Sequence, residues 1–286
     1  MNVLTLEAPA KINLHLAVGA KRPDGYHEIE SVMQEIDLCD LVSMTRAPRA
    51  AGQQIAVHCS DPAVPCDRRN IVWKCAEAFF RAYGIAEYDI FIDIEKHIPS
   101  SAGLAGGSSD GAATLKALNL LFGIRADRDR LMQIGASVGA DIPFCLAGGT
   151  CLCRGIGERV TPLAVPKPSW AVLVAFPGGG ISTSEAYRLL DASPAAEPSS
   201  PDMLLAELRS GRLPSSLFND FERVVLPRHP GAADLRKRMR SLGASSVLMS
   251  GSGPSVFGLF PALSDARQAR DALLADGIPA WAAKPL

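Results

Sequence analysis

The sequence of 286 residues lacks a surplus of charge of either sign. It has 29 Lys and Arg residues against 30 Asp and Glu residues, which gives a formal net charge of -1 at pH 7. A nucleic-acid groove or a contact with an anionic membrane needs an excess of basic side chains. We therefore expect small-molecule substrates, with neither nucleic acid nor membrane as a partner.

Long apolar runs are also missing. The longest, around Trp170 to Phe176, is much shorter than the roughly 20 residues that a membrane-spanning helix requires. Residues 1–20 have no basic start followed by an apolar stretch, so they predict no signal peptide. We expect a cytoplasmic protein that is a monomer or a weak homodimer.

The cysteines and histidines show no metal-binding or disulfide pattern. The seven cysteines are an odd number and contain no C-x-x-C pair, and the five histidines are scattered along the chain. This usage predicts reduced thiols instead of a disulfide framework, and no protein-bound metal.

The two standard phosphate-binding signatures are absent as well. No lysine follows Gly106 or Gly107 as a Walker loop requires, and the pairs Gly155-Ile-Gly157 and Gly251-Ser-Gly253 lack the third glycine of a dinucleotide fingerprint. The absence of both signatures argues against a Walker-type ATPase and against a Rossmann-type dehydrogenase.

What the sequence does contain is a glycine-rich stretch, Pro99–Ala113, between a strand and a helix. The strand is 89–95, in which every second residue is isoleucine, and apolar residues at helical spacing follow up to Phe122. Free N–H groups at a helix N-terminus, the helix dipole and glycines without side chains together favour a phosphate. The alternative is a plain glycine turn.

Individual residues of this stretch have predicted roles. Gly103, Gly106 and Gly107 allow close approach of an anion, and Ser108 and Ser109 cap the helix or add hydroxyl donors. Asp110 would add negative charge beside a phosphate. We therefore expect it to accept hydrogen bonds from the N–H groups of the first helical turn.

The order of the predicted elements indicates an α+β protein with about two domains, and an apolar content of 48% supplies a core for each. A proline-rich loop over 194–201 is expected to be mobile. The predicted elements are a strand at 12–18, extended segments ending near Met44, a helix at 76–82, a helix at 128–138, a strand at 170–176, a capping box at Ser182–Glu185, a helix at 232–241, strands near Val247 and Phe257 around a glycine hairpin at 250–254, and a last helix at 264–275.

Two charged residues are candidates for catalysis. Lys11 shares one face of the first strand with Asn13, on the side opposite the apolar residues, although an ordinary exposed lysine would fit too. Asp141 lies in Gly139-Ala-Asp-Ile-Pro-Phe144, among small and apolar residues where a carboxylate needs a partner such as a lysine. Its alternative role is a helix or turn cap.

Tyr26 and His27 follow the turn Arg22-Pro-Asp-Gly25. An aromatic ring and an imidazole at the end of a loop can stack on and hydrogen-bond a flat heterocycle. A core tyrosine and a surface histidine are the alternative.

Three segments in this order resemble the GHMP kinase superfamily, which includes galactokinase, homoserine kinase and mevalonate kinase. They are Pro9-Ala-Lys-Ile-Asn-Leu14, the loop Pro99–Ala113 and Ser250-Gly-Ser-Gly-Pro-Ser-Val256. The segments Arg22-Pro-Asp-Gly-Tyr-His-Glu-Ile29 and Gly139-Ala-Asp-Ile-Pro-Phe144 narrow the resemblance to members that act on 4-diphosphocytidyl-2-C-methyl-D-erythritol. The similarity covers nearly the whole chain.

The resemblance implies a two-lobed fold and an activity. The N-terminal domain, 1–163, would be like ribosomal protein S5, and the C-terminal domain, 164–286, would be ferredoxin-like. The activity would be ATP-dependent phosphorylation of the substrate's 2-hydroxyl in non-mevalonate isoprenoid synthesis, with Mg²⁺ carried by ATP.

The resemblance also assigns roles by motif. Lys11 and Asp141 would be catalytic, Asn13 would face the erythritol, and Tyr26 and His27 would contact the cytosine. The residues expected near ATP are Asn70, Lys96, Pro99, Ser100, Ser101, Ala102, Gly103, Leu104, Ala105, Gly106, Gly107, Ser108 and Ser109. Relatives often have more glycine where this chain has Ser100, Ser101 and Ala105.

Two other functions fit the same motifs. The first is a GHMP kinase that acts on another small alcohol, of the homoserine or mevalonate type. The second is a non-catalytic sensor of nucleotides or sugar phosphates, which would be expected to lose Lys11 or Asp141, and both are present.

Overall fold

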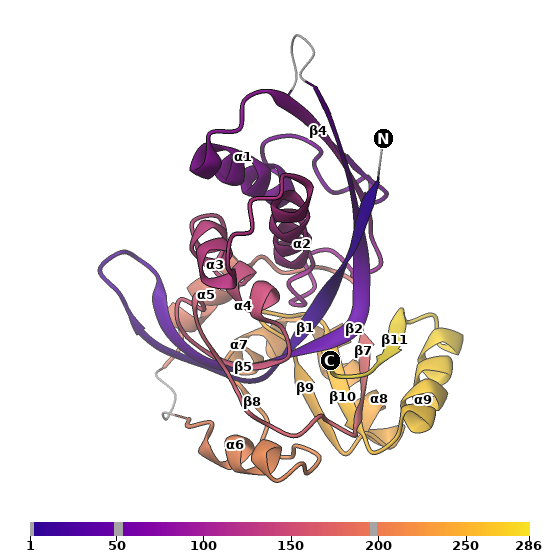
Figure 1. The fold of residues 1–286 in the computed structure, drawn as a ribbon. Helices are drawn as coiled ribbons and strands as arrows, with labels where there is room; N and C mark the ends of the chain where they lie inside the picture. Colours follow the sequence, from indigo (N-terminus) through magenta and orange to yellow (C-terminus); the bar gives the residue numbers. More distant parts are fainter. Residues whose placement is uncertain (1–2, 49–53, 195–198) are drawn as a thin grey trace. The chain divides into compact units, whose positions relative to one another are not determined.

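The computed structural model describes residues 3–48, 54–194 and 199–286, which divide into two compact units. The first unit holds the described parts of 1–10, 39–100 and 105–147, and the second holds those of 11–38, 101–104 and 148–286. Both are discontinuous because the strands β1 (Leu4–Lys21) and β2 (His27–Pro48) belong partly to each (Figure 1). The sequential domains 1–163 and 164–286 remain a prediction.

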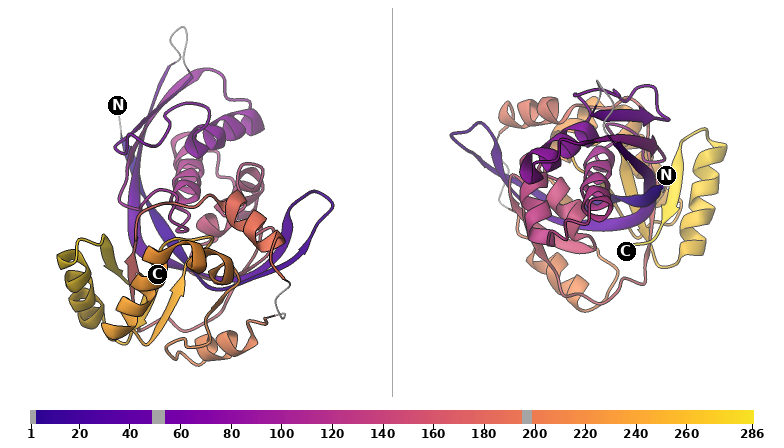
Figure 2. Two further views of the ribbon diagram at one scale, coloured as in Figure 1. Left: turned by 180° about the vertical axis from the view of Figure 1, so that it is seen from behind. Right: turned by 45° about the horizontal axis from the view of Figure 1, so that its top comes forward.

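The first unit combines strands with a group of helices. Within it β3 and β4 pair in parallel, and β4 pairs antiparallel with the second half of β2. Helices α1, α2 and α3 contact one another and α4 contacts α2 and α3; Figure 2 shows α1, α2 and α3 gathered together. The further elements of this unit are β3 (Ile55–Cys59), α1 (Ile71–Tyr83), β4 (Tyr88–Glu95), α2 (Gly106–Leu121), α3 (Arg128–Ala136) and α4 (Ile142–Ala147).

The alternation predicted for 89–95 is confirmed in β4. Ile90, Ile92 and Ile94 are all buried, while Phe91 and Asp93 between them are exposed. The strand ends at Glu95 and the chain reaches α2 eleven residues later, at Gly106. The predicted order of strand, glycine loop and helix is therefore correct.

The second unit contains the remaining elements. They are β5 (Thr150–Gly155), β6 (Arg159–Pro162), β7 (Ala171–Ala175), α5 (Thr183–Asp191), α6 (Asp202–Arg209), β8 (Phe218–Asn219), α7 (Glu222–Val225), the 3-10 helix η1 (Leu226–Arg228), α8 (Pro230–Ser241), β9 (Ser246–Met249), β10 (Val256–Phe260), α9 (Leu263–Ala275) and β11 (Ala280–Ala283). Strand β5 pairs antiparallel with both β2 and β6, and β8 pairs in parallel with β1.

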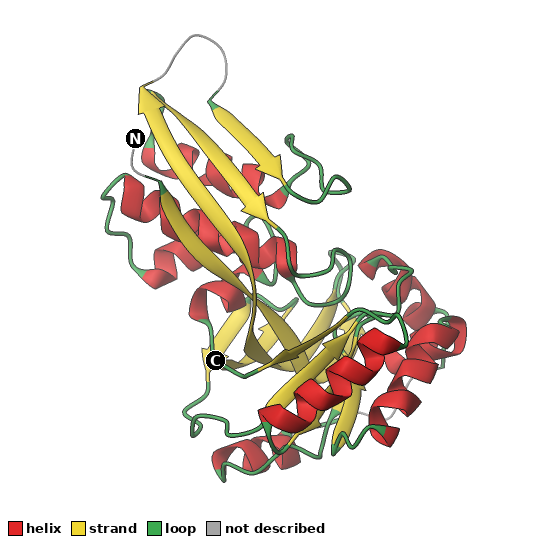
Figure 3. Cartoon of the chain, turned by 90° about the vertical axis from the view of Figure 1, so that its right-hand side faces the viewer, coloured by secondary structure: helices red, strands yellow, loops and turns green. Residues whose placement is uncertain are grey.

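A separate antiparallel sheet in the second unit has the order β11-β7-β10-β9. Together with α8 and α9, which contact its strands, it forms the β-α-β-β-α-β arrangement of a ferredoxin-like fold (Figure 3). Its core is apolar throughout, from Leu173 on β7 to Met239 on α8 and Leu273 on α9. This part of the predicted fold class is confirmed.

Several element boundaries differ from the sequence prediction. The first helix begins at Ile71 instead of Ala76, because the Asn70 side chain accepts the Val72 N–H and caps it there. The second strand continues past Met44 to Pro48, since β4 pairs with it over that length. Of the predicted capping box, the N-cap at Ser182 is confirmed, because its hydroxyl accepts the Glu185 N–H.

The loop over 194–201, which was predicted to be mobile, is only partly described, because its central residues 195–198 lie outside the described residues.

Among the helices of the described ranges, none combines the length and apolar character needed to span a bilayer.

Candidate active site

The loop that leads into α2 has an unusual backbone. Ser101, Gly103 and Ala105 all have positive φ angles, of 54°, 77° and 56°. Ala105 is the N-cap residue of α2 and has no side-chain oxygen to accept an N–H from the first turn. A loop with this shape presents the α2 N-terminus without a side-chain cap from that residue, as an anion site requires.

Two corrections follow for the serines at the start of α2. Because the helix begins at Gly106, Ser108 and Ser109 lie within its first turn and neither is the N-cap residue. The predicted capping role is wrong for both. Ser109 is also buried, whereas Ser100, Ser101 and Gly107 are exposed.

The three glycines of the loop meet different surroundings. A Cβ atom at Gly103 would lie 2.1 Å from the backbone oxygen of Ser250, and one at Gly106 would lie 3.2 Å from Nζ of Lys96. Among the residues that the structure describes, a Cβ at Gly107 would meet only a side-chain atom of Ile71, at 3.5 Å. Packing therefore requires glycine at Gly103, a Cβ at Gly106 would be tightly packed, and Gly107 leaves space above the helix terminus.

The tip of the loop, residues 101–104, is tied to two other superfamily motifs. The Lys11 N–H donates to the Leu104 carbonyl at 3.1 Å, and the Ser250 hydroxyl donates to the Gly103 carbonyl at 3.0 Å. Asn219 in turn donates to the carbonyl of Gly251 at 2.9 Å. The late glycine hairpin, the least specific of the motifs in sequence, therefore supports the loop directly.

Lys11 begins a chain of buried polar contacts. Its Nζ donates to Asn13 Oδ1 at 2.6 Å, Asn13 Nδ2 contacts the Ser31 hydroxyl at 2.8 Å, and that hydroxyl donates to the His15 carbonyl at 2.7 Å. Lys11 is only 4% exposed. The expectation of a polar face opposite the core is wrong: both faces of this part of β1 are buried, so the lysine is held in a defined position.

Asp141 lies in the turn before α4 and is partly exposed. Its backbone oxygen accepts the N–H of Cys145 at 3.1 Å and so starts the helix. The main chain of Asp141 therefore contributes to the start of α4, close to the helix or turn cap that the sequence offered as the alternative role. The catalytic role of its carboxylate stays a prediction.

His27 contacts two residues of helix α5 in its own unit. Its Nε2 lies 2.8 Å from Asp191 Oδ1, and its ring stacks on Tyr187 with centroids 5.0 Å apart. Tyr26, one residue earlier, is 59% exposed. Sequence reasoning missed Asp191 and Tyr187, since the capping box that predicted their helix carries no signal of what the helix faces.

Lys96 occupies a buried cluster of charges. Its Nζ contacts the carboxylates of Asp40 and Asp110, the second at 2.8 Å. The other oxygen of Asp40 accepts the N–H groups of His97 and Ile98, at 2.6 and 2.8 Å. This cluster joins the residues after β4 to the first turns of α2. Lys96 therefore has a structural role at both ends of the loop, in addition to the predicted contact with ATP.

The role predicted for Asp110 is wrong. Its carboxylate contacts Lys96 instead of the first-turn N–H groups, and its Oδ1 is buried with no hydrogen-bond partner within the described ranges. Burial raises the pKa of Asp110 to about 7, the nearby Asp40 also raises it, and Lys96 only partly offsets this effect. Lys96 itself has a raised pKa: burial lowers it, but the two carboxylates more than compensate.

Asn70 has a local structural role. Its Oδ1 caps α1, and its Nδ2 donates to the Pro65 carbonyl at 2.7 Å. The predicted contact with ATP remains a prediction for this residue.

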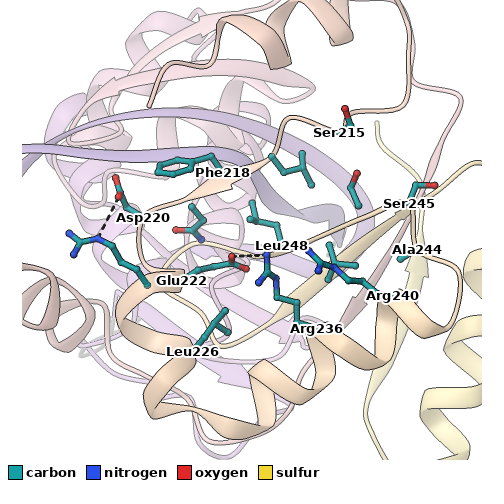
Figure 4. Close-up of a pocket in the computed structure, with 15 residues that line it drawn as sticks. Ser215, Phe218, Asp220, Glu222, Leu226, Arg236, Arg240, Ala244, Ser245 and Leu248 are labelled. Atoms are coloured by element: carbon teal, nitrogen blue, oxygen red, sulfur yellow. Dashed lines mark ion pairs between the residues drawn. The ribbon is translucent and has the colours of Figure 1, made fainter. Parts of the chain in front are cut away.

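A pocket of about 960 Å³ in the second unit contains none of the residues predicted from the sequence (Figure 4). Its charges are largely paired, Arg236 with Glu222 and Arg223 with Asp220. In the parts of the chain that the structure describes, no group of three or more His, Cys, Asp or Glu side chains is placed to hold a metal ion.

Comparison with known proteins identifies the family. Residues 70–149 match the GHMP kinases N terminal domain, and residues 204–278 match the GHMP kinases C terminal domain. The 4-diphosphocytidyl-2-C-methyl-D-erythritol kinase of Clostridium kluyveri is 42% identical over 260 residues, which cover 90% of this chain and 91% of that protein. The chain belongs to this kinase family. The enzyme of the same name from Geobacillus thermodenitrificans is 43% identical over 90% of this chain and 88% of its own length.

Solved structures agree with membership of this family. A crystal structure of 4-(cytidine 5'-diphospho)-2C-methyl-D-erythritol kinase has a TM-score of 0.81 and 36% identity, with 99% of both chains covered. The homoserine kinase of Cytophaga hutchinsonii has a TM-score of 0.74 at 21% identity, over 99% of this chain and 95% of its own. At that identity the second likeness concerns the fold only. The predicted GHMP kinase fold is thus confirmed.

Proposed function

We propose that this protein transfers a phosphoryl group from ATP to the 2-hydroxyl of 4-diphosphocytidyl-2-C-methyl-D-erythritol and gives the 2-phosphate, a step of non-mevalonate isoprenoid precursor synthesis. The observation that carries the proposal is 42% identity to a kinase named for this substrate, over 90% of the chain. The uncapped helix start after a glycine loop supports ATP as the donor.

The acceptor hydroxyl needs help to react. A tertiary alcohol is a poor nucleophile near neutral pH, and a positioned carboxylate that takes its proton makes attack on phosphorus easier. We assign this role to Asp141, with Lys11 as the cation that keeps the carboxylate ionised and orients the hydroxyl. The buried contact of Lys11 with Asn13, at 2.6 Å, supports a fixed ammonium group.

The loop would bind the triphosphate. Phosphoryl transfer depends mainly on in-line placement and on neutralisation of negative charge spread over the phosphates. Backbone N–H groups at Gly106 and Gly107 would supply part of this, and Mg²⁺ would enter with ATP as part of the nucleotide substrate. We keep residues 99–109, Asn70 and Lys96 as the proposed ATP contacts.

The other end of the substrate would be recognised by the second unit. Asn13 would face the erythritol, and Tyr26 and His27 the cytosine, because an exposed ring and a fixed imidazole suit a planar base. We also propose that the enzyme acts in the cytoplasm on small molecules, as a monomer or weak homodimer.

An acceptor panel tests the function. Purified protein with ATP and Mg²⁺ would be offered the cytidyl substrate, 2-C-methyl-D-erythritol 4-phosphate, homoserine and mevalonate, and ADP release would be measured. We expect turnover with the cytidyl compound and at least about 100-fold lower kcat/KM with the others, since a site that hydrogen-bonds a base loses those contacts with an acceptor that lacks it. Turnover of homoserine or mevalonate alone would refute the substrate, and tight binding without any turnover would indicate a sensor.

A further inference from the structure

The carboxylate of Asp191, at the end of α5, bridges the side chains of the last residue of β1, Lys21, and the first residue of β2, His27. Its Oδ1 lies 2.8 Å from Nε2 of His27, and its Oδ2 accepts from Nζ of Lys21 at 2.6 Å. The hydrogen bond from Lys21 is the main cause that lowers the pKa of Asp191, and the His27 contact adds to it. Asp191 is therefore a carboxylate at neutral pH, which can only accept hydrogen bonds.

This contact determines which nitrogen of His27 carries the proton in the neutral ring. Since Oδ1 of Asp191 has no hydrogen to give, the proton must be on Nε2. Nδ1 then has a free lone pair and is an acceptor. No side chain or backbone group of the described residues donates a hydrogen bond to it.

The ring that presents this acceptor is held rigidly. His27 is only 9% exposed at its side chain and stacks on Tyr187 at an interplanar angle of 17°. Tyr187 in turn packs edge-on against Phe221, with centroids 5.0 Å apart. Rotation of the ring about Cβ–Cγ, which would put carbon atoms where the two nitrogens lie, has to break both the stack and the contact with Asp191.

We propose that Asp191 is a specificity-determining positioning residue, which fixes the Nε2–H tautomer of His27 so that Nδ1 accepts a hydrogen bond from the amino group of cytosine. The inference rests on the proposed function, and it adds a residue that acts through His27. Uracil has a carbonyl oxygen where cytosine has its amino group. With uracil, two acceptors would face each other and both would remain unpaired.

The kinetic test uses two substrates and three variants. The uridyl analogue, 4-diphosphouridyl-2-C-methyl-D-erythritol, is compared with the cytidyl compound. In the wild type we expect kcat/KM to favour cytosine at least about 100-fold. Asp191→Asn can either accept from or donate to His27, so we expect the preference to fall about tenfold through KM for the cytidyl compound, with kcat and KM for ATP unchanged.

Two control variants separate the tautomer from general effects of charge and packing. Lys21→Met removes the other partner of Asp191 but leaves the contact with His27, and Asp276→Asn makes the same chemical change in an exposed ion pair with Arg238. Both should keep the wild-type preference within about twofold. A loss in Lys21→Met equal to that in Asp191→Asn would overturn the proposal.

A spectroscopic measurement is independent of turnover. Nitrogen-15 NMR of histidine-labelled wild-type protein, with His27 assigned by its absence in His27→Gln, should show the neutral ring with Nε2 protonated and Nδ1 bare. A neutral ring with its proton on Nδ1, or an unchanged base preference in a folded Asp191→Asn variant, refutes the inference. If neither substrate is turned over, the proposed function fails, while the NMR spectrum still decides the tautomer.

Discussion

Replacement of Asp110 by asparagine should remove a specific pH dependence from the stability of the protein. The carboxyl group is buried beside Asp40 and Lys96, and its pKa in the folded state is about 7, against 3.8 in a model compound. Between these values the folded protein holds a proton that the unfolded chain releases. This contribution to stability is complete below pH 4 and is lost as the pH rises through 7.

The magnitude follows from the two pKa values. At pH 5 the raised pKa stabilises the fold by about 3 kcal/mol relative to an unshifted group, and at pH 8 by almost nothing. Asparagine cannot titrate. The difference in unfolding free energy between wild type and Asp110→Asn should therefore change by about 3 kcal/mol between pH 5 and pH 8, in favour of the variant at high pH.

Urea unfolding followed by far-UV circular dichroism and tryptophan fluorescence measures this difference. Titrating groups outside the cluster of Asp110, Lys96 and Asp40 are common to both proteins and cancel. Asp129→Asn, an exposed carboxylate in the first turn of α3, is the matched control and should show no such change. A wild-type to Asp110→Asn difference that is equal at pH 5 and pH 8 would show that the Asp110 carboxyl is ionised throughout and would refute the reasoning.

The remaining predictions concern the site and its loop. Asp141→Asn should lower kcat by roughly two to four powers of ten with an unchanged dissociation constant for ATP, as measured by ADP release and calorimetry, and wild-type turnover would remove Asp141 from the mechanism. His27→Ala should mainly raise KM for the cytidyl substrate in steady-state kinetics, and an unchanged value would place the base elsewhere. Ala105→Gly should stabilise the protein by about 0.5–1 kcal/mol in urea unfolding, because φ is 56° and glycine adopts it without strain; a destabilised variant would contradict this. Gly103→Ala should destabilise the protein by more than about 2 kcal/mol in the same assay, since its Cβ would lie 2.1 Å from the Ser250 oxygen, and a neutral effect would mean that the hairpin can move away.

Two residues of the loop combine a side chain with a strained backbone. Ser101 and Ala105 have positive φ angles although neither is glycine. A side chain at such an angle costs on the order of 1–2 kcal/mol. The loop lies before α2 as predicted, and the positive φ angles of Ser101 and Ala105 cost the folded state conformational energy.

The sequence alone determined the order of the elements that it predicted, the glycine loop between β4 and α2, and the resemblance to the kinase family, because periodicity and motifs are recorded in neighbouring residues. Only the tertiary structure decided that Lys11 is buried, that Asp110 faces Lys96, that the late hairpin supports the loop, and that Asp191 holds His27. His27 and Asp191 are 164 residues apart, and Gly103 and Ser250 are 147 apart. Local patterns show which face of an element is polar, but the partner of a polar group depends on how the whole chain folds.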